Sequence, residues 1–119
     1  MKHKLAAVAQ GRFQVLLASR SAQCAKMTLR PGASSDEDVS NEHPKSEQWV
    51  YVVSGTGRAT IIQGKVRRHV KLVPGSVLLI EKRELHQIRN SGSRPLVTIN
   101  FYVPPAYMPD GEPKLPKGC

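Results

Sequence analysis

The chain has 119 residues, of which 39% are hydrophobic and 23% charged, and this composition indicates one soluble globular domain. No apolar run approaches the ~20 residues of a membrane-spanning helix, so we expect no membrane partner. The formal net charge is +9, but the basic residues are dispersed along the chain and only 5% of residues are aromatic, which argues against a nucleic-acid partner.

The first quarter of the chain predicts a short leading segment and two strands. The apolar part of the leading segment, Leu5 to Ala9, is shorter than the ~7–15 residues of a secretory signal, so we expect a cytoplasmic protein. Residues 13–19 are apolar β-formers. Residues 22–29 alternate between apolar and other side chains, which is the period of a half-buried strand.

A polar segment and six further strands follow. Residues 31–46 are a loop by composition, and loops of this length in compact domains tend to be functional or mobile. Turns containing glycine, proline or charged residues then separate apolar stretches at residues 48–54, 58–62, 66–72, 77–80, 85–89 and 96–103. Eight short strands without a convincing helix predict an all-β antiparallel sandwich or barrel.

We expect a single domain over residues 1–119, with its core at about 13–103. The proline-rich stretch 104–119 predicts an extended tail, because proline cannot join the centre of a sheet. The segment 100–107 contains three aromatic residues. Three placements are open for it: it caps the mouth of the barrel, it packs across a partner chain, or it packs in an ordinary way within its own chain.

Two histidines, His43 and His86, each lie close to an apolar β-like stretch. Taken singly, a loop histidine such as His43 is usually solvated and a strand histidine such as His86 is usually structural. If the strands fold back on one another, however, the two side chains can share one pocket. Neutral imidazoles bind Fe, Ni, Zn, Cu or Mn through nitrogen.

The residues around His43 resemble the first motif of the cupin family, which are small antiparallel β-barrels of the jelly-roll type. That motif is written G-x5-H-x-H-x3–4-E-x6-G. Counted back from Gly55, Gln48 stands where the family usually has glutamate, and His43 matches the second histidine. Asn41 stands at the first histidine and Ser35 at the opening glycine.

The residues around His86 resemble the second cupin motif, written G-x5-P-x-G-x2-H-x3-N. Gly75, His86 and Asn90 match it at the correct spacing. Glu81 replaces its proline, and Arg83 replaces its second glycine. With both motifs, the chain resembles a small single-domain cupin, which implies an antiparallel jelly-roll β-barrel.

The resemblance implies a divalent metal ion in the barrel, with His43, Gln48, His86 and Asn41 as its ligands. Gln48 and Asn41 add no negative charge, so we expect weak binding, and the donors do not distinguish Fe, Ni, Zn, Mn or Cu. The neighbouring Glu47 is chemically the better ligand. A shift of one residue in strand register would exchange it for Gln48, so either residue can face the pocket.

The resemblance also implies that the pocket binds or acts on a small polar molecule, anionic ones included. Cupins host enzymes, sensors and storage proteins, so whether the chain is an enzyme stays open. The alternative function is a metal-free binding or sensor cupin without catalysis.

The strand at 48–54 also predicts a partner. If Gln48 faces the barrel, Val50 and Val52 line it, while Trp49 and Tyr51 face outward. Large aromatic side chains on an outer sheet face favour being covered. Cupins often cover that face by dimerising, so we expect a homodimer.

Overall fold

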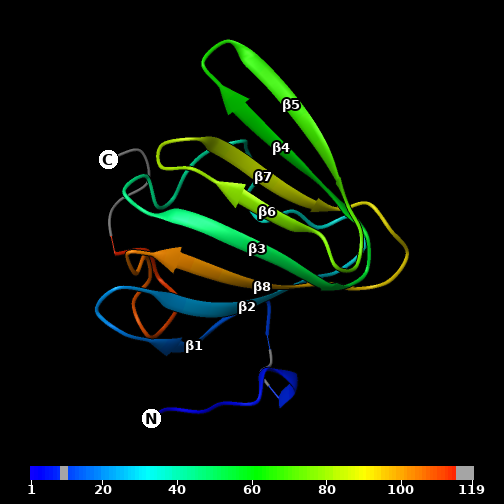
Figure 1. Ribbon diagram of the computed structural model, residues 1–119. Coiled ribbons are helices and arrows are strands. Elements are labelled where there is room, and N and C mark those ends of the chain that lie inside the picture. The colour runs from blue at the N-terminus through cyan, green and yellow to red at the C-terminus, as the bar shows by residue number, and fades with distance from the viewer. Residues whose placement is uncertain (9–10, 115–119) are drawn as a thin grey trace.

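The computed structural model describes residues 1–8 and 11–114, which form two antiparallel sheets packed face to face (Figure 1). A 3₁₀ turn, η1 (Ala6–Val8), precedes eight strands: β1 (Phe13–Ala18), β2 (Gln23–Leu29), β3 (Glu47–Ser54), β4 (Gly57–Gln63), β5 (Val66–Leu72), β6 (Val77–Ile80), β7 (Leu85–Asn90) and β8 (Leu96–Val103). Every strand end lies within one residue of its predicted position, so the all-β fold is confirmed. Residues 115–119, the end of the expected tail, lie outside the described residues.

The two sheets have the topology of a jelly-roll barrel. One contains five strands in the order β1-β2-β8-β3-β6, and the other contains three in the order β5-β4-β7. The chain crosses between the sheets after β3, after β5, after β6 and after β7, and the hairpin of β4 and β5 extends beyond the rest of the barrel in Figure 1. Within the described residues, no helix is long and apolar enough to cross a membrane.

Apolar side chains from both sheets fill the space between them. Val50 and Val52 of β3 are fully buried, whereas Trp49 and Tyr51 on the same strand are exposed, as the alternation predicted. Burying an aliphatic side chain of this size contributes roughly 1.5–3 kcal/mol. The main cluster is formed by ten buried residues: Met27, Leu29, Val50, Val52, Ala59, Ile61, Leu72, Ile80, Ile88 and Leu96.

The turn between β3 and β4 brings the chain against the start of β8. Gly55 has a φ of +84°, and a Cβ atom at this position would lie 2.3 Å from the carbonyl oxygen of Pro95. Only glycine combines this backbone conformation with so close an approach. The turn therefore fixes how β3 leaves the five-stranded sheet and enters β4 of the other one.

The polar segment 31–46 runs along β7 and is tied to it. Backbone bridges join Ser34 to Arg89 and Ser40 to His86. The amide of His86 donates to the carbonyl of Ser40 at 2.8 Å, and the amide of Ser40 donates back at 3.1 Å. The predicted loop thus continues the edge of the three-stranded sheet and carries the following residues to the barrel mouth.

The segment after β8 also lies at the barrel mouth. Ala106 and Tyr107 are buried, and the carboxamide of Gln23 on β2 holds both of them. Its oxygen accepts the amides of Ala106 at 3.1 Å and Tyr107 at 3.0 Å, and its nitrogen donates to the carbonyl of Tyr107 at 2.8 Å. Of the segment 100–107, residues 100–103 form the end of β8, and residues 106–107 lie at the barrel mouth.

Candidate functional site

The two predicted histidines meet inside the barrel. His43 lies just before β3, at the end of the five-stranded sheet, and His86 lies on β7 of the other sheet. Their ring centroids are 4.9 Å apart and the ring planes are inclined by 42°. The two motifs therefore converge on one site, although the residues are far apart in the sequence.

His43 is buried and neutral. Its Nδ1 lies 3.2 Å from the carbonyl oxygen of Ser46, which can only accept, so Nδ1 carries the proton. Burial lowers the pKa of His43, and this effect outweighs the hydrogen bonds from Ser46 and Gln48 that raise it. The Nε2 atom of neutral His43 therefore presents a lone pair to the barrel interior.

A buried relay of side chains leads away from that lone pair. The carboxamide of Gln48 lies 2.8 Å from Nε2 of His43 and 3.1 Å from the carboxamide of Asn100, which in turn lies 3.0 Å from Oγ1 of Thr98. With the oxygen of Gln48 toward neutral His43, two acceptors would face one another. Exchanging the oxygen and the nitrogen in both carboxamides removes this conflict. Gln48 then donates to His43, Asn100 donates to Gln48, and the hydroxyl of Thr98 donates to Asn100. Every member of the relay is then satisfied.

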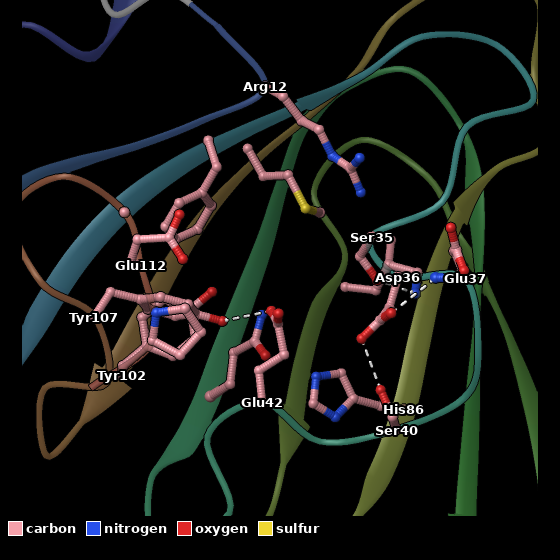
Figure 2. Close-up of a pocket in the computed structure, with 16 residues that line it drawn as sticks. Arg12, Ser35, Asp36, Glu37, Ser40, Glu42, His86, Tyr102, Tyr107 and Glu112 are labelled. Atoms are coloured by element: carbon pink, nitrogen blue, oxygen red, sulfur yellow. Dashed lines mark hydrogen bonds between the residues drawn. The ribbon is translucent and has the colours of Figure 1, made fainter. Parts of the chain in front are cut away.

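His86 offers a second lone pair. Its Nδ1 lies 3.1 Å from the carbonyl oxygen of Glu84, so the proton resides there and Nε2 is the acceptor. Burial, and then the proximity of His43, lower the pKa of His86 to about 4. His86 is thus neutral at physiological pH, and its ring lines the pocket (Figure 2).

The register of β3 resolves the choice between Glu47 and Gln48. Gln48 is 4% exposed and faces the interior. It pairs with Ile80 on β6 and Tyr102 on β8, which are both buried. Glu47 points away, and its carboxylate accepts a hydrogen bond from Nε1 of Trp49 at 3.1 Å. The inward side chain is therefore the amide and not the carboxylate.

Asn41, the remaining predicted ligand, is also buried, but both ends of its amide bind backbone. Its nitrogen donates to the carbonyl of Glu84 at 3.0 Å, and its oxygen accepts the amide of His43 at 2.7 Å. In this arrangement Asn41 joins the two histidine-bearing segments and orients His43.

The donors fit a divalent metal ion with two imidazole nitrogens and one amide oxygen. Both imidazoles are neutral, but the lone pair of His43 accepts the hydrogen bond from Gln48, so a metal ion would have to replace that bond and take the amide oxygen of Gln48 instead. In the part of the chain that the structure describes, no group of three or more His, Cys, Asp or Glu side chains could hold a metal ion. The three donors carry no negative charge themselves, so they favour weak binding.

His86 and Gln48 line a pocket of about 450 Å³ at the barrel mouth (Figure 2), and His43 lies behind them. Its aromatic wall was only partly foreseen from the sequence. Tyr107 packs against Phe13 and Tyr102 with ring centroids 4.7 and 4.9 Å apart, and Tyr102 packs against His43 at 5.1 Å. Burial raises the pKa of both tyrosines, so their hydroxyls stay neutral and can donate.

Sequence reasoning also missed Asn100. Thr98 and Asn100 are polar residues two positions apart in the otherwise apolar strand β8, and both are fully buried. Polar side chains at a period of two within an apolar strand place a hydrogen-bonding row on one face of it. That spacing was a readable signal of a polar interior.

Together, the fold and the site define a small antiparallel jelly-roll β-barrel with a polar pocket at its mouth. The Cupin domain family matches residues 25–102, and the chain belongs to the cupin family. No curated protein matches the sequence.

Solved structures show the same fold. BH2720 from Bacillus halodurans has a TM-score of 0.76 at 22% identity, with 86% of this chain and 76% of that chain covered. KdgF from Halomonas sp. has a TM-score of 0.66 at 16% identity, with 78% and 77% covered. Oxalate decarboxylase from Bacillus subtilis, which has Mn(II) centres, has a TM-score of 0.68 at 26% identity, but the match covers 76% of this chain and only 23% of that longer one.

Proposed function

We propose that this cupin binds a small polar molecule in its barrel pocket, and that His43 and His86 hold a divalent metal ion there together with Gln48. The observation that carries the proposal is the pair of neutral imidazoles with ring centroids 4.9 Å apart. His86 lines a pocket of about 450 Å³, which suits a small molecule. The oxalate decarboxylase of similar fold has Mn(II) centres, which supports a metal ion in this fold.

The chain's own residues have distinct parts in this proposal. His43 and His86 supply nitrogen lone pairs, Gln48 supplies an amide oxygen after turning over, and Asn41 assists by orienting His43. A bound ion would act as a Lewis acid toward an oxygen atom of the ligand. The metal identity is not set by these donors, since imidazole and amide ligands accept Fe, Ni, Zn, Mn and Cu alike.

Metal analysis after equilibration tests this proposal. Protein purified without chelator and dialysed to equilibrium against excess Mn²⁺ or Zn²⁺ should hold about one equivalent per chain above the metal free in the dialysate. The His86→Gln variant should lose most of it, whereas His69→Gln, which changes an exposed histidine on β5, should bind like the unmodified protein. Retention below a tenth of an equivalent by the unmodified protein would contradict the metal site.

A metal-free binding cupin is the second candidate, and the relay of His43, Gln48 and Asn100 favours it. These residues already satisfy one another by hydrogen bonds, as they would in a pocket that recognises its ligand directly. This candidate predicts that a ligand raises the unfolding temperature equally with and without EDTA. The metal-assisted candidate predicts that EDTA removes most of the shift.

We also propose a homodimer and a cytoplasmic location. The outer face of the five-stranded sheet exposes Trp49, Tyr51, Val77 and Phe101, and a second copy would cover these side chains. Cys24 is a free thiol, which suits a reducing compartment.

A further inference from the structure

The pocket has a charge opposite to that of the whole molecule. The chain has 18 basic and 9 acidic residues, giving a formal net charge of +9. Four of the acidic residues nevertheless line this one pocket, with a single basic residue, Arg12: the four are Asp36, Glu37, Glu42 and Glu112. With His86 neutral, four carboxylates and one guanidinium leave the pocket lining with a formal charge of −3.

Strand register places positive charge elsewhere. Arg58 on β4 lies directly opposite Lys71 on β5 and Arg89 on β7, so three exposed cations stand side by side across the three-stranded sheet. Like charges in directly opposed positions are unfavourable in a sheet. The residues facing the pocket from inside that sheet, such as Ile88 and His86, carry no positive charge at neutral pH.

The acidic side chains come from two segments that the fold brings to the barrel mouth. Asp36 accepts hydrogen bonds from the hydroxyl of Ser40 at 2.7 Å and the amide of Glu37 at 2.8 Å, which directs it along the loop beside β7. Glu42 accepts a hydrogen bond from the hydroxyl of Tyr107 at 3.3 Å. In the view of Figure 2 the carboxylate of Glu42 lies between Tyr107 and His86.

The single guanidinium does not give the pocket an anion-binding character. Arg12 is exposed, and its Nη2 donates to the backbone carbonyl of Ser34. It therefore already binds an oxygen of the protein at the rim. Among the described residues, no lysine lines the pocket.

The remaining wall suits a cation as well. Phe13, Tyr102 and Tyr107 contribute aromatic rings, and Tyr107 contacts both of the others. The faces of aromatic rings attract ammonium and guanidinium groups. The carboxylate of Glu42 is an acceptor, and Nε2 of His86 is another in the metal-free protein, so this part of the wall suits a donor group of the ligand.

We propose that this pocket selects a small organic cation, with a primary ammonium or guanidinium group placed at Glu42 against the rings of Tyr102 and Tyr107. The inference rests on the proposed function, because it names the chemical class of the ligand for the same pocket. It replaces the expectation that anionic ligands are included.

A matched series of four-carbon probes tests the charge preference. Butane-1,4-diamine, butane-1,4-diol and butanedioate have the same chain length, and their formal charges are positive, zero and negative. Their affinities should be measured by calorimetry at neutral pH and low salt on EDTA-treated protein, so that the dicarboxylate cannot bind through a metal ion. We expect the diamine to bind at least tenfold more tightly than the diol, and butanedioate to bind most weakly.

The outcomes separate this inference from the proposed function. If butanedioate binds as tightly as the diamine or more tightly, the cation preference is wrong, but the pocket is still a small-molecule site. If the diamine does not bind measurably at millimolar concentration, the cation inference is also wrong. The metal analysis described above then decides the metal site independently.

Variants locate the preference in the pocket. Glu42→Gln keeps the shape of the side chain and removes its charge, so the diamine should bind at least tenfold more weakly and the diol should be unaffected. Asp38→Asn is the matched control, because Asp38 is an acidic residue of the same segment that does not line the pocket. If both variants weaken diamine binding equally, the effect comes from the overall electrostatic potential of the protein and not from Glu42, and the inference is wrong. If Glu42→Gln does not fold, Glu112→Gln replaces it as the test variant, because Glu112 is exposed at the rim of the pocket, and it should also weaken diamine binding.

Discussion

Gln48 stands where most cupins have a carboxylate, and this one side chain sets the character of the site. It lies 2.8 Å from His43 and is buried. We predict that Gln48→Glu strengthens divalent-metal binding by roughly tenfold, because it adds a negatively charged oxygen beside two imidazoles. Without metal, the variant should be less stable by ~1–3 kcal/mol, since a buried carboxylate replaces a neutral amide. Metal titration and denaturant unfolding measure the two effects.

Glu47→Gln is the matched control for that prediction. It makes the reverse change one residue earlier on β3, where the side chain points outward and binds Trp49. It should change neither metal affinity nor the stability difference between metal-loaded and metal-free protein. If Gln48→Glu also leaves metal affinity unchanged, Gln48 is not a ligand and the metal-free candidate gains support.

His86 gives the stability of the fold a defined pH dependence. Its pKa falls from the ordinary 6.5 to about 4 in the folded protein, so the unfolded chain takes up the proton first as the pH falls. The contribution of neutral His86 is therefore fully present above pH 6.5 and is lost between pH 6.5 and about 4. Between pH 7 and pH 5 we expect the free energy of unfolding of EDTA-treated protein to fall by about 2 kcal/mol from this residue. The lowered pKa of His43 acts in the same direction.

Denaturant unfolding of His86→Gln at the same two pH values isolates that contribution. The variant has no titrating group at this position, so its loss of stability between pH 7 and pH 5 should be smaller than that of the unmodified protein. An identical loss in both proteins would mean that His86 is not desolvated in solution.

At the scale of elements, the turn between β6 and β7 contains a local strain. Arg83 has a φ of 66°, and it is the one described residue other than glycine with a positive φ. It stands at the second glycine of the second cupin motif, and its amide donates to the carbonyl of Pro44 next to His43 at 3.1 Å. We predict that Arg83→Gly stabilises the protein by ~0.5–1 kcal/mol, the relief of strain being partly offset by the flexibility of glycine in the unfolded chain. Thermal unfolding measures it.

Lys82→Gly is the control for the strained turn. Lys82 is exposed and has no positive φ, so glycine there brings only the entropic cost of ~0.5–1 kcal/mol. Equal destabilisation by both substitutions would show that the turn adopts an ordinary conformation in solution.

The elements themselves were predictable from local pattern. Alternation of side chains and turn residues placed the eight strands, and motif spacing brought His43 and His86 together. The inward face of β3 was not predictable, because one residue of register exchanges Glu47 for Gln48 and only the pairing with β6 and β8 decides it.

The walls of the pocket could not be predicted either, because they form through contacts between residues even farther apart in the sequence. Tyr107 reaches Glu42 across 65 residues of sequence, and Gln23 holds the backbone of Tyr107 across 84. Such contacts leave no periodic signal in the chain. The acidic character of the pocket was hidden for the same reason, since Glu112 joins Asp36 and Glu42 only after the C-terminal segment folds onto the barrel mouth.

At the scale of the whole molecule, an apolar face remains uncovered on the five-stranded sheet. Tyr51 pairs with Val77 and with Ile99, while Trp49 pairs with Leu79 and with Phe101, so the side chains form two adjacent rows across β6, β3 and β8. Trp49, Phe101 and Val77 are 41%, 43% and 66% exposed. Several large apolar side chains gathered on one face, in a chain with few aromatics, are typical of an interface.

We predict that two copies associate through this face, with the sheets of the two protomers packed against each other. Val77→Glu puts a charge at the β6 end of one row, where burying it without a partner would cost several kcal/mol, so the variant should be monomeric at concentrations where the unmodified protein is dimeric. Light scattering after size exclusion measures the mass. Val66→Glu, at a valine that is 53% exposed on the projecting β4–β5 hairpin, is the matched control and should stay dimeric. A monomeric unmodified protein, or equal behaviour of the two variants, would contradict the dimer, and the exposed aromatic rows would then need a different partner to cover them.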